Sequence, residues 1–331
     1  MALDLNADRL VAIVGPTASG KSALAVEAAR RFNGEIVSCD SVQVYRGLDV
    51  GSGKPSAEAR SLVPHHLVDI LDLGADMNAA VFAERAAGAI RDIAGRGRLP
   101  IVAGGTGLYL TALLKGLFPG GGTDGPVRDR LRALLKQHGP ARLHRLLARR
   151  DPAYAARTKV SDGVRIVRAL EVSFVLGRPF SGLQQERQPA FSGSTLIIGI
   201  ELSRQELRQR VATRVDGMLA DGLIEETRRA LAGVPPGARA PRSLGSIGYR
   251  EVTARLGQGP LPPQGDDELH RAIVTSTMQY AKRQMTYFRH QFQVEWFADR
   301  AAALARVENW VGRERVGRPA PIFPPGAGGS R

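Results

Sequence analysis

Residues 9–22 read RLVAIVGPTASGKS, and this stretch decides the fold. The apolar, β-branched run at 9–14 is typical of a buried parallel strand, and it stops at a glycine. The following residues, 15–22, match the P-loop pattern G-x-x-x-x-G-K-[ST]. Residues 21–32 then carry apolar side chains on one helical face: Leu24, Ala25, Ala28 and Phe32. Strand, glycine turn and helix together predict a phosphate-binding βα unit.

The chemistry of this loop is the binding of a di- or triphosphate. Small residues let backbone N–H groups surround the phosphates, and the next helix points its N-terminus at the same charge. Lys21 is expected to bridge phosphate oxygens and the Ser22 hydroxyl to hold Mg²⁺. The predicted phosphate-binding residues are Gly15, Thr17, Ala18, Ser19, Gly20, Lys21 and Ser22. Kinases and NTPases are the commonest owners of P-loops, so the motif alone favours a nucleotide-binding, ATP-using enzyme. A basic RNA-binding module with a nucleotide switch is a third interpretation.

Further strands are predicted at 35–39, 66–70, 99–103 and 196–202, with a helix over 78–94. Strands that alternate with helices indicate an α/β fold whose parallel sheet is flanked by helices. Two long amphipathic helices are expected at 203–232 and 266–290.

The alternating pattern breaks at a turn-rich segment, PGGGTDGP, at 119–126. From 126 to 168 there are twelve Lys and Arg against three Asp and Glu. We therefore expect a core domain made of 1–118 with 193–312, and a basic helical insertion over 119–192. Residues 313–331, rich in Pro and Gly without periodicity, are expected to be a disordered tail.

Charge and composition limit the function classes. The 331 residues carry a net charge of +14, which fits a polyanionic partner or a solvated basic surface. The one cysteine, Cys39, forms no internal disulfide, and His65-His66 is expected to be structural because adjacent residues point to opposite faces of a strand. No apolar run reaches the ~18 residues of a membrane span, so a cytoplasmic protein without membrane contact is expected. No oligomerisation signal is visible, and a monomer is the default.

Polar residues follow two of the predicted strands at their carboxyl ends, where ligands bind in open parallel sheets. Asp40 follows the strand at 35–39, and Thr106 lies in the glycine turn after 99–103. Asp40 fits three roles equally from its chemistry: a helix cap, a carboxylate that orders Mg²⁺, or a general base.

The sequence resembles the bacterial tRNA dimethylallyltransferases. The resemblance lies in GPTASGKS, CDSVQVYRGLDVGSGKPS, PHHLVDI, GGTGLYLTALLKG, SDGVRIVRALEV, RVDGMLADGLIEE, GSIGYREV and QYAKRQMTYFRHQF, and it spans residues 9 to 292. It implies a P-loop-type core with a helical insertion that grips the tRNA anticodon stem-loop. It also implies transfer of the dimethylallyl group of dimethylallyl diphosphate to N6 of the adenosine immediately 3′ of the anticodon, position 37.

The resemblance also implies roles for individual residues. Asp40 becomes the general base, Thr106 supports the reacting centre, and Arg214 is a further diphosphate ligand. Segments implied to contact tRNA contain Asp40, Ser41, Val42, Gln43, Val164, Arg165, Ile166, Val167, Arg168, Gly245, Ser246, Ile247, Gly248, Tyr249, Arg250, Lys282, Arg283, Gln284 and Arg289. Arg165 and Arg168 lie three apart on one helical face. Tyr249, Tyr280 and Tyr287 fit either base stacking or core packing.

Two positions depart from the family pattern. Met278 stands where the family usually has Arg, and Tyr287 stands where it has Trp. Ser22 replaces a frequent Thr, and either hydroxyl can hold the metal. The C-terminal zinc finger of eukaryotic relatives needs cysteines that this chain lacks.

Overall fold

The computed structural model describes residues 9–118, 125–183, 186–235 and 240–316. Its described residues form two compact units, each with its own apolar core. The core unit contains residues up to 78, 85–107 and those from 193 onward, and the helical unit contains 79–84 and 108–192. The helical unit therefore also takes in 79–84 and 108–118, which the sequence analysis placed in the core domain.

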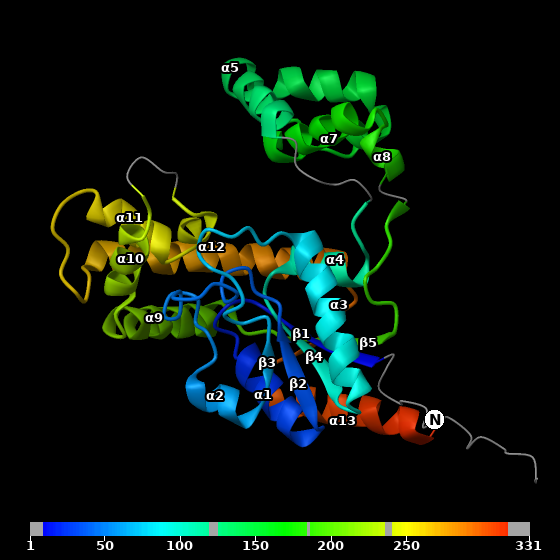
Figure 1. Ribbon diagram of the computed structural model, residues 1–331, viewed down its shortest axis with the longest axis vertical. Coiled ribbons are helices and arrows are strands. Elements are labelled where there is room, and N and C mark those ends of the chain that lie inside the picture. The colour runs from blue at the N-terminus through cyan, green and yellow to red at the C-terminus, as the bar shows by residue number, and fades with distance from the viewer. Residues whose placement is uncertain (1–8, 119–124, 184–185, 236–239, 317–331) are drawn as a thin grey trace, which may run out of the picture. The chain divides into compact units, whose positions relative to one another are not determined.

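The core unit is built on a six-stranded parallel sheet with the order β3-β2-β4-β1-β5-β6 (Figure 1). The strands are β1 (Arg9–Val14), β2 (Gly34–Ser38), β3 (His65–His66), β4 (Leu99–Gly104), β5 (Ser194–Ile200) and β6 (Glu295–Phe297). The predicted α/β class with a flanked parallel sheet is confirmed. The predicted strand at 66–70 was wrong beyond His66, because Leu67 and Asp69 have positive φ angles of 61° and 56° that end the extended backbone. The short strand β6 was not predicted.

Both faces of the sheet are covered, which explains why β1 is apolar throughout. Val11 and Ile13 pack with Leu24 of α1 (Lys21–Arg31) and Leu304 of α13 (Arg300–Val316). The alternate residues of β1 are equally buried, so the opposite face is covered as well. Helix α13 continues to Val316, so the tail predicted from 313 begins too early, and 317–331 lie outside the described residues.

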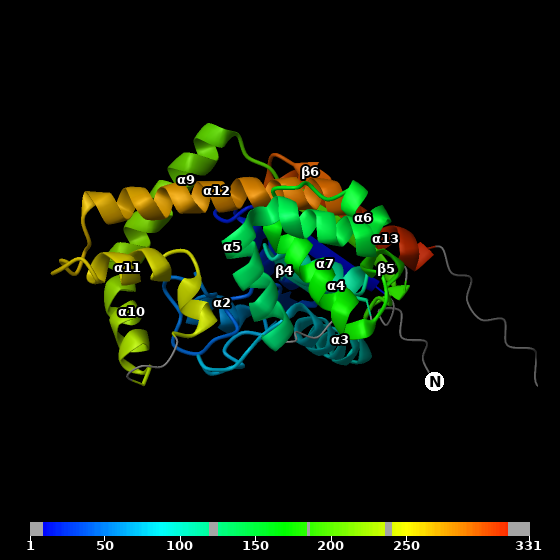
Figure 2. The same cartoon turned by 90° about the horizontal axis from the view of Figure 1, so that it is seen from above.

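A group of helices follows β5 along the chain and bounds the functional site. It contains α9 (Arg204–Ala220), α10 (Leu223–Ala232), the 3₁₀ turn η2 (Arg242–Gly245), α11 (Tyr249–Leu256) and α12 (Asp267–Gln291). The single helix predicted over 203–232 was wrong: Gly222, with φ 94°, separates α9 from α10. Helix α12 packs along α9, as Figures 1 and 2 show, and it confirms the helix predicted over 266–290.

The remaining helices of the core unit are α2 (Ala57–Leu62) and the larger part of α3 (Ala79–Gly95). The helical unit contains α4 (Gly107–Leu114), α5 (Gly125–Arg150), α6 (Pro152–Ala156), α7 (Gly163–Leu176) and α8 (Phe180–Leu183). Helix α5 is kinked at Gly139, which has φ 73° and precedes a proline. Its two halves pack on α7 through Leu131, Leu143, Ile166 and Leu170 (Figure 2).

The two adjacent histidines are structural, as the sequence predicted. His66 Nε2 lies 2.6 Å from Glu35 Oε2, and the same buried carboxylate pairs with Arg96 and Arg98. His65 Nδ1 lies 2.8 Å from the Val63 carbonyl oxygen. Within the described ranges no cluster of three or more His, Cys, Asp or Glu could hold a metal ion. In that same part of the chain, no helix combines the length and the apolar character that crossing a bilayer requires.

Candidate active site

The P-loop adopts a phosphate-binding conformation between β1 and α1. Gly15 has φ +146°, and a Cβ there would lie 3.1 Å from the Ile200 carbonyl oxygen, so a side chain would be strained and crowded. Ala18 and Gly20 also have positive φ angles, of 63° and 93°, which turn the chain into α1. The Ser19 hydroxyl is buried and has no hydrogen-bond partner in the described part of the chain. The loop thus presents unsatisfied polar groups at a helix N-terminus, as an anion site requires.

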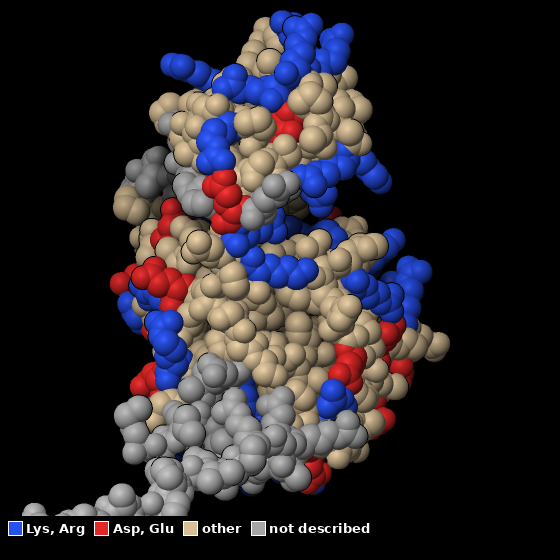
Figure 3. All heavy atoms as spheres, turned by 90° about the vertical axis from the view of Figure 1, so that its right-hand side faces the viewer, with Lys and Arg blue, Asp and Glu red and all other residues tan. Residues whose placement is uncertain are grey.

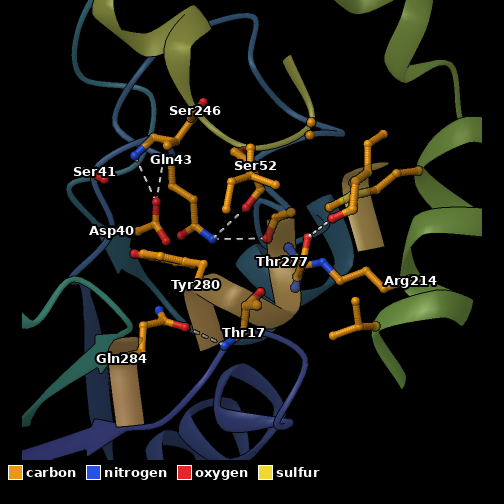
Figure 4. Close-up of a pocket in the computed structure, with 18 of the residues that line it drawn as sticks. Thr17, Asp40, Ser41, Gln43, Ser52, Arg214, Ser246, Thr277, Tyr280 and Gln284 are labelled. Atoms are coloured by element: carbon orange, nitrogen blue, oxygen red, sulfur yellow. Dashed lines mark hydrogen bonds between the residues drawn. The ribbon is translucent and has the colours of Figure 1, made fainter. Parts of the chain in front are cut away.

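A cavity of about 340 Å³ opens beside this loop and collects residues that are distant in sequence (Figure 4). Predicted site residues that line it are Thr17, Lys21, Ser22, Asp40, Ser41, Val42, Gln43, Arg214, Gly245, Ser246, Ile247, Gly248, Arg250, Arg283 and Gln284. The carboxyl ends of β1, β2 and β4 all reach the cavity, because parallel strands end at the same edge of the sheet.

Two of the cations that line this cavity, Lys21 and Arg214, are buried. Burial and the neighbouring Arg214 charge lower the pKa of Lys21 to about 8, although Asp40 opposes this shift. Burial also lowers the pKa of Arg214, again against Asp40. Arg214 makes no hydrogen bond or ion pair within the described residues, and Lys21 Nζ donates only to the Pro16 carbonyl oxygen at 3.2 Å. A bound anion with more than one charge would stabilise the charged forms of both side chains.

Asp40 follows β2 and is held by its own turn. Its Oδ1 accepts hydrogen bonds from the backbone N–H groups of Val42 at 2.8 Å and Gln43 at 3.3 Å. Burial and the Asp40 charge raise the pKa of Tyr280 to about 12, so this hydroxyl stays protonated beside the carboxylate (Figure 4). A carboxylate oriented through one oxygen is suited to accept a proton through the other.

Thr106 lies behind the cavity and does not line it directly. Its backbone N–H donates to the Cys39 carbonyl oxygen at 3.2 Å, which joins the ends of β2 and β4. Its hydroxyl is buried beside the Tyr280 side chain. A supporting role close to Asp40 is compatible with this position.

Gln284 belongs to the anion site, whereas the resemblance had placed it in a tRNA-contacting segment. Its side-chain oxygen accepts from Thr17 N–H at 2.9 Å, and its nitrogen donates to the Gly105 carbonyl oxygen at 3.0 Å. The residue is only 5% exposed, and it braces the P-loop against the turn after β4.

The expected contact of the Tyr249 side chain with tRNA is corrected. Its side chain is fully buried in the core unit and its hydroxyl donates to Glu226 Oε1 at 2.6 Å, so stacking on a base is excluded in this conformation. The flanking residues Gly248 and Arg250 still line the cavity. Gln43, another residue implied to contact tRNA, has its side chain bonded to Ser38 and to the Gly53 carbonyl oxygen, at 2.8 and 3.0 Å.

The residues in and near the C-terminal half of α12 lie in different environments. Lys282 is exposed, and Arg283 lines the cavity with its guanidinium 5.7 Å from the Tyr280 ring centre. Arg289 forms an ion pair with Glu201. Met278, at the position where the family usually has Arg, packs against the apolar cluster of α9 and α12. The Tyr287 ring lies so close to Gly107 that a Cβ there would approach to 2.3 Å, so this aromatic residue packs within the fold.

The basic segment of the helical unit presents a more limited set of RNA-binding candidates than expected. Ile166 and Val167 are buried in its core, at 0% and 5% exposure, so side-chain contacts with RNA are excluded. Arg168 pairs at 3.0 Å with the buried Glu171. Val164 and Arg165 are exposed at the start of α7. Among the charged side chains visible on the helical unit at the top of Figure 3, most are Lys and Arg.

Several cavity residues escaped the sequence analysis. They include Gly51, Ser52, Gly53, Ala103, Val211, Val215, Met218, Ile273 and Thr277, with Tyr280 left undecided. On α9, four of the lining residues, Val211, Arg214, Val215 and Met218, recur at helical spacing. That spacing was visible in the sequence, but it did not reveal which face would line a cavity. Arg210, one turn before Arg214, was missed as well, and its guanidinium donates to the Ser19 carbonyl oxygen at 3.4 Å.

The side chains at this site fit Mg²⁺ when a substrate phosphate supplies further ligands. Ser22 is exposed at the start of α1 and lines the cavity, but no protein cage of carboxylates surrounds it within the described residues. Mg²⁺ commonly binds with few protein ligands when substrate phosphates and water complete its shell. Ser22 together with a bound diphosphate would satisfy that requirement.

The fold and this cavity define a P-loop-type α/β protein with an anion site next to an oriented carboxylate. A model of the IPP transferase family matches residues 43–291, and a second model, described as isopentenyl transferase, matches residues 8–63. The chain belongs to the IPP transferase family, and the resemblance stated from its sequence motifs is confirmed.

Individual relatives agree with this assignment. The chain is 50% identical over 291 residues to the tRNA dimethylallyltransferase of Geobacter metallireducens, covering 87% of this chain and 92% of the relative. A tRNA isopentenylpyrophosphate transferase of Bacillus halodurans superposes with a TM-score of 0.65 at 36% identity, covering 93% and 96% of the two chains. A eukaryotic dimethylallyltransferase acting on tRNA gives a TM-score of 0.73 at 25% identity, covering 92% and 80%.

Proposed function

We propose that this chain transfers the dimethylallyl group of dimethylallyl diphosphate to N6 of adenosine 37 in tRNA, next to the anticodon. The observation that carries the proposal is the convergence of Lys21, Arg214 and Asp40 on one cavity. The two cations provide an anion site at the P-loop, and the carboxylate stands beside it. Membership of the IPP transferase family supports the same reaction.

The chemistry needs each of these parts. The adenine N6 attacks the allylic carbon, the bond from that carbon to the diphosphate oxygen breaks, and diphosphate leaves with the electron pair. The amine is a weak nucleophile because its lone pair is delocalised into the ring. Asp40 accepts the N6 proton as the new bond forms, a contribution of ~10²–10⁴ in rate. Lys21 and Arg214 stabilise the charge that develops on the leaving diphosphate.

Mg²⁺ held by Ser22 would supply further charge neutralisation on the diphosphate. The adenine has to leave its stack to reach Asp40, so base flipping from a single-stranded loop is part of the proposal. Arg165 and the other exposed cations of the helical unit would contact the phosphates of the anticodon stem-loop. We propose a cytoplasmic location, because the proposed substrate is a tRNA. We further propose a monomer as the active form.

The test incubates the protein with Mg²⁺, unmodified tRNA and labelled dimethylallyl diphosphate, and then digests the RNA to nucleosides. Label is expected in N6-isopentenyladenosine. Asp40→Asn keeps the acceptor oxygen that holds the Val42 turn but removes the base, so the rate should fall by ~10²–10⁴. Its affinity for inorganic pyrophosphate should not decrease, because the lost charge is negative.

Two outcomes would overturn the proposal. Label that stays on the diphosphate while ATP is hydrolysed in a parallel assay would favour a kinase or NTPase. RNA affinity without a covalent product, unchanged in Asp40→Asn, would favour an RNA-binding module.

A further inference from the structure

A buried carboxylate outside the cavity holds one of its walls. Glu226 of α10 is 4% exposed and accepts four hydrogen bonds. Its Oε2 accepts from the backbone N–H groups of Asp49 at 2.8 Å and Val50 at 2.9 Å. Its Oε1 accepts from Gly51 N–H at 3.1 Å and from the Tyr249 hydroxyl at 2.6 Å. Three consecutive backbone amides of one loop therefore converge on a single side chain.

Tyr249 completes this arrangement from α11. Its ring is fully buried, and a Cβ on Gly51 would lie 2.5 Å from the Tyr249 Cζ. Only glycine therefore fits at position 51 of the loop. The pKa of Tyr249 is raised by burial and by its hydrogen bond to Glu226, which keeps the hydroxyl protonated as a donor. The carboxylate thus has four donors in fixed positions.

The loop that Glu226 holds leads directly to a cation of the anion site. Gly51, Ser52 and Gly53 line the cavity. The Arg214 guanidinium lies against Gly53 so closely that a Cβ there would be 2.1 Å from Nη2. Arg214 has no hydrogen bond or ion pair of its own in the described part of the chain. The Gly53 backbone therefore limits where the guanidinium can lie.

We propose that Glu226 and Tyr249 are positioning residues for the diphosphate donor: they hold residues 49–51 so that Gly53 aligns Arg214 with the diphosphate. This inference rests on the proposed function, in which Arg214 binds that group. Neither residue touches the donor. Their effect passes through the loop and ends at one guanidinium.

The decisive experiment is a double-mutant cycle on the full-length protein, with the affinity for inorganic pyrophosphate measured by calorimetry. Tyr249→Phe removes one donor to Glu226 and keeps the ring. It should weaken pyrophosphate binding on the order of tenfold in the wild-type background, the scale of one hydrogen bond to a charged group. In an Arg214→Ala background the same change should have almost no effect, because the residue it positions is gone. An equal loss in both backgrounds overturns the proposal.

The matched control is Thr227→Val on the same helix. Thr227 is fully buried and its hydroxyl donates to the Leu223 carbonyl oxygen within α10, away from the loop. This variant should lower the thermal midpoint by an amount similar to Tyr249→Phe and leave pyrophosphate affinity unchanged. A parallel loss of affinity in the control would show that general destabilisation, not alignment, weakens binding.

Amide hydrogen exchange separates this inference from the proposed function. Glu226→Gln places an NH₂ group where two donors converge, so exchange at residues 49–51 should accelerate while the rest of α10 stays protected. If the variant exchanges fast but even the wild type does not bind pyrophosphate, the proposed diphosphate function is refuted. The role of Glu226 in holding the loop would still be supported. Unchanged exchange at residues 49–51 would refute the positioning role itself, whatever the activity.

Discussion

Gln284 and Thr17 are joined by a hydrogen bond of 2.9 Å between the side-chain oxygen of the first and the backbone N–H of the second, 267 residues apart in the chain. The Gln284 Nε2 donates to the Gly105 carbonyl oxygen, and a Cβ on Gly105 would lie 2.1 Å from this nitrogen. Helix α12 therefore sets the position of the P-loop relative to the turn after β4. The phosphate cradle depends on a residue that a motif search would assign to RNA binding.

Replacing Gln284 with Met keeps the side-chain length and removes both hydrogen bonds. The Thr17 end of the loop should then move, and the KM for dimethylallyl diphosphate should rise on the order of tenfold, with a smaller change in kcat. Steady-state kinetics at saturating tRNA would measure this. Gln279→Met, on an exposed position of the same helix, is the control and should leave the donor KM unchanged. A lower kcat at constant KM would contradict a role in the phosphate cradle.

The pH dependence of donor capture should report Lys21. Its pKa is lowered from the ordinary value to about 8, so the charged form is lost in the free protein as the pH rises through 8. The kcat/KM for the donor should therefore fall above that pH. At saturating donor the bound diphosphate favours the ammonium, and kcat should persist to higher pH.

Lys21→Arg provides the control for this profile, because a guanidinium keeps its charge far above this range. Its kcat/KM should be lower than that of the wild type but flat across the same pH values. A wild-type profile that stays level well beyond pH 8 would show that Lys21 does not titrate there.

Gly53→Ala should displace Arg214 without unfolding the core unit. The new Cβ would lie 2.1 Å from Nη2, and this neighbour is the end of a flexible side chain that can move away. Donor affinity should drop by a factor of about ten, comparable to losing one charge-assisted hydrogen bond. Gly47→Ala is matched in backbone strain, with φ +78° against +59°, and has open space around it. It should cost stability alone, and both variants can be compared by thermal unfolding and pyrophosphate binding.

The helical unit should depend on Glu171. This carboxylate is fully buried and pairs with Arg128 at 2.8 Å and Arg168 at 3.0 Å. Glu171→Gln removes the buried charge that these two guanidinium groups share and should destabilise the unit by about 3 kcal/mol. Amide exchange across α5 and α7 would measure the loss, and pyrophosphate binding should be unaffected. Asp129 pairs with Arg132 at 3.9 Å on the exposed surface. Asp129→Asn should therefore change neither amide exchange nor pyrophosphate binding.

The sequence alone determined the parts of this protein whose signal is local. The first βα unit follows from residues 9–31 because strand, glycine turn and helix are contiguous and their periodicities differ. Asp40 could be placed in the site since it ends a buried parallel strand, and such strands share one ligand-binding edge. The family motifs then predicted which reaction that edge performs.

Only the tertiary structure decided which polar residues face the ligand and which brace the fold. Gln284, Glu226 and Tyr249 act through partners from about 20 to about 270 residues away, and no local pattern encodes the rotation of a helix about its axis. For the same reason Ile166 and Val167, which were expected in an RNA-contacting segment, lie in an apolar core. Whether a side chain binds a substrate or supports a neighbour depends on packing between distant segments, and that packing exists only once the chain has folded.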